Sequence, residues 1–176
     1  TEKLDFLIQS LVKLSRMESG IIAVHSEDTT IKQMLESIQQ QFNVKVREKN
    51  ITLSLCDTDL HVRCDSKWTV EALGNIVDNA IKYTACGGNV QIKVEQYSFF
   101  VKIDIIDDGI GIEKEEIPKI FGRFYRSLSV ADQPGVGIGL FLAREIIQAQ
   151  KGYIKVISKR EKGSTFSVFL PISKKE

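Results

Sequence analysis

The chain has 176 residues, of which 43% are hydrophobic and 27% are charged, a composition that supports one globular domain with a sizeable core and excludes a disordered chain. The 24 Lys and Arg residues nearly balance the 23 Asp and Glu residues, so we expect no attraction to nucleic acid or to an acidic membrane from the overall charge. The 3 cysteines show no CxxC pair and no His/Cys cluster with metal-ligand spacing, which argues against a disulfide framework or a zinc site and favours a reducing compartment.

No stretch of the chain approaches the roughly 18 apolar residues of a membrane span, and no signal-peptide pattern opens it. The first residue is Thr1 instead of Met, so we interpret the chain as a piece of a longer protein. An upstream membrane anchor in that longer protein is compatible with this interpretation.

Residues 1–20 are predicted to form an amphipathic helix that ends at Gly20. Leu4, Leu7, Leu11 and Leu14 occupy the a and d positions of two heptads. Two interpretations remain open. Either this apolar face packs on the core of the domain, or the helix continues upstream and pairs with a partner helix.

The rest of the chain alternates between predicted strands and helices, which favours an α/β (α+β) two-layer sandwich: one mixed, mostly antiparallel sheet with helices on one face. The predicted strands are 21–26, 51–56, 61–64, 90–97, 99–106, 153–158 and 165–171. The predicted helices are 29–42, 66–84 and 139–152. Residues 107–134 break into glycines, charges and aromatics, and a loop of this length in a compact domain is usually functional.

The helix predicted at 66–84 carries a polar stripe opposite its apolar face. Glu71, Asp78, Asn79 and Lys82 all lie within about 60° of Asn75 on a helical wheel. Asparagine is a poor helix former, so two asparagines one turn apart favour oxygen ligands for a hard cation or groups that face phosphate. The alternative is an ordinary solvent-exposed face.

The stretch "DIIDDGIGI" ends a predicted strand at Asp107 and continues into a turn at Gly109 and Gly111. Glycine lets the backbone approach a ligand because no Cβ stands in the way. A carboxylate beside such a turn is a plausible acceptor for an exocyclic amine. A plain glycine turn is the alternative.

The stretch "GVGIGL" places Gly135, Gly137 and Gly139 where a helix begins, and the free N–H groups there suit a phosphate. It is not the GxGxxG dinucleotide motif, since Leu140 stands at the position of the third glycine, and it is not a P-loop. Upstream, "FGRFYRS" combines arginines, which bind phosphate well, with aromatic residues able to hold a mobile loop.

Taken together and in this order, these stretches resemble the catalytic ATP-binding domain of bacterial two-component sensor histidine kinases. "NIVDNAIKYT" resembles the asparagine box of that family, "DDGIGI" the first glycine box, "FGRFYR" the phenylalanine box, "GVGIGL" the second glycine box and "GSTF" the third. The resemblance covers residues 21–171. It implies the Bergerat-type fold of the wider GHKL group, which includes the gyrase and Hsp90 ATPase domains, with ATP held under a flexible lid.

The resemblance also implies roles for the polar stripe and for the end of the strand before the loop. Asn79 matches the magnesium ligand, and Asn75 matches the asparagine that faces the nucleotide phosphates. Lys82 and Tyr83 match positions that support phosphate and ribose. Asp107 matches the aspartate that accepts the adenine amino group.

Further positions of the expected ATP site lie in the loop and beyond it. Arg126 would reach the terminal phosphate, so that Asn75, Asn79, Lys82 and Arg126 would carry the phosphoryl transfer. A lid would span residues 113–134. The remaining cofactor-binding positions implied by the resemblance are Gly109, Gly111, Ile112, Phe121, Gly135, Gly137, Gly139, Leu140 and Thr165.

Residues 1–20 resemble the C-terminal part of the second helix of the dimerisation and phosphoacceptor hairpin of these kinases, and residues 172–176 form a charged tail. The phosphoacceptor histidine belongs on the first helix of that hairpin, which is missing from this chain. We interpret His25 and His61, the 2 histidines present, as structural.

The resemblance implies a protein-histidine kinase that uses ATP and Mg²⁺, with its own dimerisation domain and a cognate response regulator as partners and no nucleic acid. The full-length protein would be a homodimer, and this chain a cytoplasmic domain of a membrane-bound sensor. Two alternatives stay open: a nucleotide-binding signalling module without kinase activity, and a GHKL-type serine kinase that acts on a protein partner.

Overall fold

The computed structural model describes residues 2–19 and 23–172. The elements follow one another as α1 (Glu2–Glu18), β1 (Glu27–Thr30), α2 (Ile31–Glu48), β2 (Thr52–Leu55), β3 (His61–Cys64), α3 (Ser66–Tyr83), β4 (Asn89–Gln96), β5 (Phe100–Asp107), the short 3-10 helix η1 (Leu128–Val130), α4 (Gly139–Ala149), β6 (Tyr153–Ser158) and β7 (Ser164–Pro171).

Within the described residues, five strands form one sheet in the order β2-β4-β5-β7-β6. Strand β2 pairs parallel with β4, and the other three pairings are antiparallel. The expectation of a mixed, mostly antiparallel sheet is therefore confirmed. The expectation of a single sheet is corrected, because β1 and β3 pair with each other in a separate two-stranded sheet.

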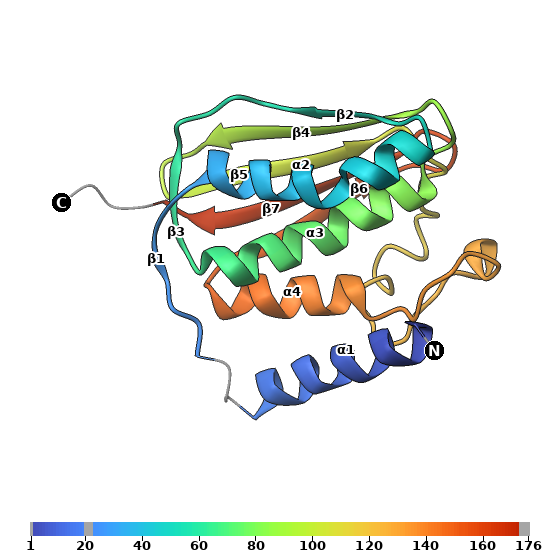
Figure 1. Cartoon of the computed structure of the whole chain (residues 1–176), viewed down its shortest axis with the longest axis horizontal. Helices are drawn as coiled ribbons and strands as arrows, with labels where there is room; N and C mark the ends of the chain where they lie inside the picture. Colours follow the sequence, from blue (N-terminus) through green and yellow to red (C-terminus); the bar gives the residue numbers. More distant parts are fainter. Residues whose placement is uncertain (1, 20–22, 173–176) are drawn as a thin grey trace.

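Helices α2, α3 and α4 lie over one face of the five-stranded sheet, which gives the two layers seen in Figure 1. The core forms between these layers, where alternate residues of each strand meet the apolar faces of the helices. In the central strand β5, Val101, Ile103 and Ile105 are fully buried. Helix α1 lies apart from the layer in Figure 1, and its Lys13 ammonium binds the Glu71 carboxylate of α3 at 2.7 Å.

The structure places the first strand later than the sequence pattern suggests. Residues 23–26 of the predicted strand have no regular structure and 21–22 lie outside the described residues, whereas β1 runs from Glu27 to Thr30. The register with β3, Glu27 opposite Cys64 and Thr30 opposite His61, decides its position, and this pairing is invisible to a local apolar pattern. Strand β1 also takes the first residues of the predicted 29–42 helix, so α2 starts at Ile31 and continues to Glu48.

The backbone of His25 and the side chain of His61 each contact a carboxylate. The backbone N–H of His25 donates to Asp65 Oδ2 at 3.0 Å, and Asp65 Oδ1 caps α3 by accepting from Trp68 N. His61 Nδ1 lies 2.8 Å from Asp28 Oδ2, across the β1–β3 pair. None of the helices in the described part of the chain is long and apolar enough to cross a membrane.

Replacement of Ile103 by Ala tests the core between the sheet and the helices. Ile103 is fully buried, so Ile103→Ala should lower the free energy of unfolding by about 2–5 kcal/mol in a urea titration, through lost burial and the cavity left behind. Ile157 on the edge strand β6 is 75% exposed, and Ile157→Ala is the matched control, expected to change stability by less than about 0.5 kcal/mol. Equal effects of the two substitutions would contradict the assignment of the buried face.

Candidate functional site

A cavity of about 190 Å³ opens beside the C-terminal half of α3. Residues from α3, the end of β5, the loop that follows it, the start of α4 and the start of β7 line it. The sequence-predicted site residues among this lining are Asn75, Asn79, Lys82, Tyr83, Asp107, Gly111, Ile112, Arg126, Gly135, Gly137, Gly139 and Leu140.

Helix α3 supplies the polar wall of the cavity because its two faces differ. The apolar residues Ile76, Val77 and Ile81 are buried in the core, and the opposite stripe therefore turns away from the sheet. Four members of the predicted stripe line the cavity, whereas Glu71 is held by Lys13 of α1. Asp78 is one of these four, although it was not among the predicted site residues.

The Asn75 side chain is half-buried at this wall, and its Nδ2 atom is fully buried. Its Nδ2 has no hydrogen-bond partner among the described residues. A Cβ added at Gly139, where α4 begins, would lie 3.5 Å from Asn75 Oδ1, so the amide lies close to the start of that helix. Leaving a buried polar group unpaired costs about 1–3 kcal/mol, and such a group in a cavity wall indicates a partner supplied by a ligand.

The Lys82 side chain brings a positive charge to the same cavity. Its Nζ lies 4.8 Å from the centroid of the Tyr83 ring. It also lies so close to Gly135 that a Cβ there would approach it to 2.8 Å, in a backbone with φ +146. A glycine at this position therefore leaves the space that the ammonium group occupies.

Asp107 ends β5 and is 8% exposed. Burial raises the pKa of its carboxyl above the ordinary 3.8, and hydrogen bonds from the backbone N–H groups of Gly109 and Ser164 oppose this rise. The Gly109 N–H donates to Asp107 Oδ1 at 2.9 Å. The cavity is thus lined by a buried carboxylate as well as by Asn75.

The glycine turn after Asp107 is held by the β6–β7 hairpin. Ile112 N donates to Ser158 Oγ at 2.8 Å. Gly111, with φ +68, packs against the hairpin so closely that a Cβ would come within 2.0 Å of the Lys159 carbonyl oxygen. Gly163, with φ +82, approaches Asp107 in the same way, since its Cβ would lie 1.9 Å from the Asp107 carbonyl oxygen. The "GSTF" stretch therefore packs against the backbone of Asp107.

Three predicted site residues do not line the cavity. Thr165 faces away because side chains alternate along β7, and its neighbours Ser164 and Phe166 line the cavity in its place. Gly109 sits beside the Tyr83 carbonyl, where a Cβ would come within 2.5 Å of the oxygen. Phe121 packs under the Arg144 guanidinium, 5.5 Å from the ring centroid. Strand alternation is the signal by which Ser164 and Phe166 could have been found.

The loop between β5 and α4 is bound mainly to itself. Arg126 Nη2 donates to the carbonyl oxygens of Val130 at 3.0 Å and Ala131 at 2.9 Å, and also to that of Gln133. The Tyr125 hydroxyl donates to Glu116 Oε1 at 3.0 Å. Arg126 thus lines the cavity while its guanidinium closes the loop around η1.

The described part of the chain contains no group of three or more His, Cys, Asp or Glu residues placed to hold a metal ion. A cation in this cavity would therefore need oxygens of a bound ligand in addition to those of single lining residues such as Asn79. This requirement fits a cation that arrives together with phosphate groups.

Comparison with known families decides among the possible ligands. The family model described as "Histidine kinase-, DNA gyrase B-, and HSP90-like ATPase" matches residues 64–174, which contain the cavity-lining residues from α3 to β7. The chain belongs to this ATPase family. It is a GHKL-type ATP-binding domain, as the resemblance of its five sequence motifs implied.

Sensor kinases are among the relatives of this ATPase domain. The sensor histidine kinase WalK of Bacillus subtilis (strain 168) is 33% identical over 181 residues, covering 100% of this chain and 30% of WalK. The Acinetobacter baumannii histidine kinase AdeS has a TM-score of 0.79 at 26% identity, with 98% of this chain and 80% of the AdeS chain covered. The chain spans less than half of the length of its curated relatives.

A second solved structure is matched over its complete chain. The mycobacterial sensor histidine kinase MprB has a TM-score of 0.75 at 25% identity, with 86% of this chain and 100% of the MprB chain covered. The predicted fold class, helices over one face of a mixed sheet after a short N-terminal helix, is confirmed by these matches.

Asp107→Asn should raise the melting temperature of this ATPase domain at neutral pH. The folded-state pKa of Asp107 is raised, so the folded domain holds the proton more tightly than the unfolded chain does. The ionised carboxylate therefore lowers stability once the pH exceeds the folded-state pKa. Thermal unfolding at several pH values should show the advantage of the variant at neutral pH and its decline toward pH 3.8. A variant that melts below wild type at neutral pH would refute this account.

Proposed function

We propose that this domain binds Mg-ATP in the cavity beside α3 and transfers the γ-phosphate to a histidine on a separate helix that is missing from this chain. The observation that carries the proposal is the buried Nδ2 donor of Asn75, which has no partner among the described residues, in a residue that lines the same cavity as Lys82 and Asp107. A nucleoside triphosphate supplies an acceptor for the amide, anions for the lysine and a base amine for the carboxylate.

The phosphate end of the proposed site lies between α3 and the start of α4. Lys82 offers a point charge, and Asn75 offers a donor that water-free surroundings strengthen. Gly135, Gly137 and Gly139 bring backbone to the cavity without side chains, and α4 begins at Gly139 with its free N–H groups. Family resemblance and this placement agree on where a triphosphate would lie.

The adenine end of the proposed site lies at Asp107. A buried carboxylate with two backbone donors has lone pairs left for an exocyclic amine. Ile112 and Phe166 line the cavity with apolar surface that suits a flat base. These groups would select adenine over a base that lacks the amino group.

The donor set also fits a magnesium ion. Asn79 lines the cavity one helical turn after Asn75, and its amide oxygen would be the protein ligand of the cation. Magnesium commonly takes one or two protein ligands and completes its shell with substrate phosphates, and when bound it would supply charge neutralisation for the triphosphate. Asn75, Lys82 and the glycine backbone would orient the phosphates for transfer.

Arg126 would have to change partners to reach a terminal phosphate. Its guanidinium is engaged by carbonyl oxygens of its own loop. Residues 113–134 would act as the lid, and a triphosphate would compete with these neutral acceptors through a stronger, charge-assisted hydrogen bond. Ordering of the lid and delivery of Arg126 would then be the same event.

The relatives of the chain support a proposal for its wider role. The match to AdeS covers 98% of this chain, so it extends over α1 as well as the ATPase domain. In the proposed arrangement α1 ends the second helix of a dimerisation hairpin, the full-length protein is a membrane-bound homodimeric sensor, and a cognate response regulator receives the phosphate. The named relatives WalK and PmrB are sensor kinases, which supports this arrangement.

Kinase activity is tested with γ-labelled ATP and the hairpin of the full-length protein supplied as a separate polypeptide. Label should appear on that polypeptide in an acid-labile, base-stable form, as a phosphohistidine requires. Label stable to acid would indicate a hydroxyl acceptor and refute the histidine kinase assignment.

Asn79→Ala should abolish the magnesium-dependent part of nucleotide affinity and leave the fold intact, because it removes a proposed ligand and no core atoms. Calorimetric titration with a non-hydrolysable ATP analogue measures the affinity with magnesium and the affinity without it. Asn43→Ala on the exposed face of α2 is the matched control and should bind like wild type. The magnesium ligand would be elsewhere if Asn79→Ala kept the full effect of magnesium.

Asp107→Asn should weaken binding of ATP by about tenfold or more, because it removes one hydrogen bond to a charged acceptor. It should weaken binding of inosine triphosphate much less. Inosine triphosphate lacks the amino group that Asp107 is proposed to accept. Competition titrations give, for each nucleotide, the ratio of the wild-type affinity to the variant affinity. Equal losses would count against adenine recognition by Asp107.

A further inference from the structure

The C-terminal end of α3 has a donor for each of its last four carbonyl oxygens. The last four carbonyls of an α-helix have no partner within the helix, so something else must satisfy them. Backbone N–H groups satisfy two of them: Thr84 N donates to Ala80 O at 3.1 Å, and Ile110 N donates to Tyr83 O at 3.2 Å.

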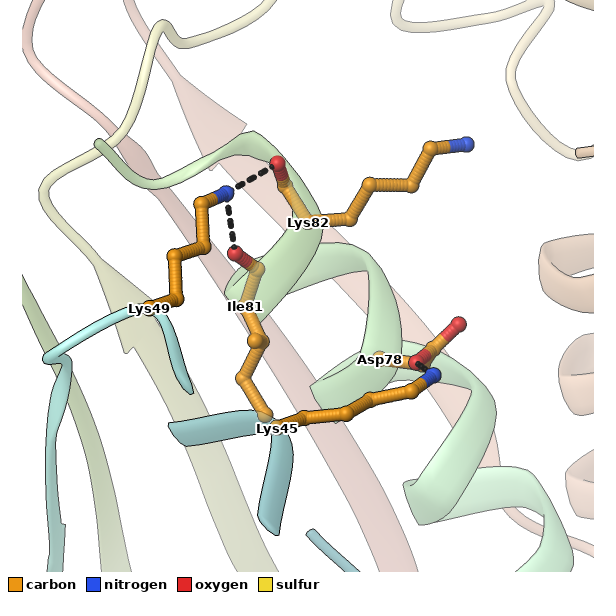
Figure 2. Close-up of polar contacts among 5 residues, drawn as sticks. All are labelled: Lys45, Lys49, Asp78, Ile81 and Lys82. Carbon is orange, nitrogen blue, oxygen red and sulfur yellow. Dashed lines mark hydrogen bonds and ion pairs between the residues drawn. The ribbon is translucent and has the colours of Figure 1, made fainter. Parts of the chain in front are cut away.

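A side chain from another helix satisfies the remaining two. Lys49 Nζ donates to Ile81 O at 2.8 Å and to Lys82 O at 2.6 Å, as Figure 2 shows. Both bonds are partly buried, both have a charged donor, and the ammonium lies at the negative end of the helix dipole of α3. The end of α3 therefore depends on a residue 32 and 33 positions away in sequence.

Lys49 also holds the chain that leaves α3. It stands at the C-cap of α2, and its own carbonyl oxygen accepts from Gly87 N at 3.3 Å. One residue thus binds the last turn of α3 through its side chain and the following turn through its backbone. Lys49 does not contribute to the cavity lining, so any effect on a ligand must pass through α3.

A second lysine of α2 lies one turn earlier and makes a weaker attachment. Lys45 Nζ binds Asp78 Oδ1 at 2.5 Å, but the two side chains are 58% and 43% exposed. Exposed ion pairs contribute little to stability because water screens them. Of the two lysine contacts between α2 and the end of α3, the partly buried ones of Lys49 are therefore the stronger.

Lys82, one of the two residues whose carbonyl oxygens Lys49 binds, brings a positive charge to the cavity. In Figure 2 the Lys82 side chain extends away from its bonded carbonyl oxygen, and its Nζ lies against Gly135. We propose that Lys49 is a positioning residue for the nucleotide phosphates. It fixes the backbone of the last turn of α3 and thereby directs the Lys82 ammonium into the cavity. This inference rests on the proposed nucleotide-binding function.

Lys49→Met tests the proposal, because methionine keeps most of the apolar stem and removes the donors. The affinity for a non-hydrolysable ATP analogue with magnesium should fall about tenfold, as expected when a binding group is misplaced without being removed. Lys49→Arg, which can still donate to two carbonyls, should stay within about twofold of wild type. Should Lys49→Met lose its native circular dichroism, Lys49→Gln replaces it in the same comparison.

The matched control removes the same charge from the other end of α2. Lys32 pairs with Asp57 at 3.0 Å in an exposed contact and lies about 25 Å from Lys49 along the helix. Lys32→Met should bind the analogue within about twofold of wild type. An equal loss of affinity in Lys32→Met and Lys49→Met would show that the effect comes from the change in net charge, and would overturn the proposal.

A double-mutant cycle with Lys82→Met separates positioning from general destabilisation. If Lys49 acts through Lys82, Lys49→Met should cost less than about twofold in the Lys82→Met background. A full tenfold loss in that background would overturn the proposal. Hydrogen exchange of the Thr84 amide in the nucleotide-free protein should accelerate in Lys49→Met and not in Lys32→Met, since fraying of the last turn frees this amide.

The outcomes distinguish this inference from the function on which it rests. A wild-type chain that binds no analogue would overturn the proposed function and the inference with it. A wild type that binds, together with Lys49→Met of equal affinity, would overturn the inference alone.

Discussion

The structure depends on helix α3, which has to pack against the core on one face and line a polar cavity on the other. One face of α3 is buried in the core, and the other forms the polar wall of the cavity, so little of the helix is left to face water. Helices α2 and α4 flank it in the same layer (Figure 1), and their contacts fix its position. Position matters here because Asn75, Asn79 and Lys82 occupy successive turns of one rigid element, which places them more precisely than a loop would.

The site is built at the expense of the stability of the free protein. Asp107 is buried with its pKa raised, and the Nδ2 donor of Asn75 is buried without a partner in the described part of the chain. Neither arrangement would survive in a core that served packing alone, because each is unfavourable until a ligand arrives. Close backbone approaches by Gly111 and Gly163 hold the Asp107 turn in place, so the turn cannot easily move to expose the carboxylate to water.

The sequence predicts what is local and periodic, and it fails where a distant partner decides. The α3 stripe follows from helical periodicity, and the cavity contains Asn75, Asn79 and Lys82 as expected. Strand β1 is displaced because pairing with β3 sets its register. The contribution of Lys49 could not be predicted, since it requires α2 to continue beyond Phe42 and to end beside the carbonyl oxygens of α3.

The two positive groups of the cavity are held in physically different ways, and this difference divides the site into two parts. Lys82 belongs to a helix end at which each of the last four carbonyls has a donor, and a glycine makes room for its ammonium. Arg126 belongs to a loop with one short 3-10 helix, where neutral carbonyls occupy its guanidinium. Exchanging neutral acceptors for an anion is favourable, whereas moving the α3 end would leave buried carbonyls unpaired. The helix side of the cavity is therefore preformed, and adjustment to a ligand falls to the loop.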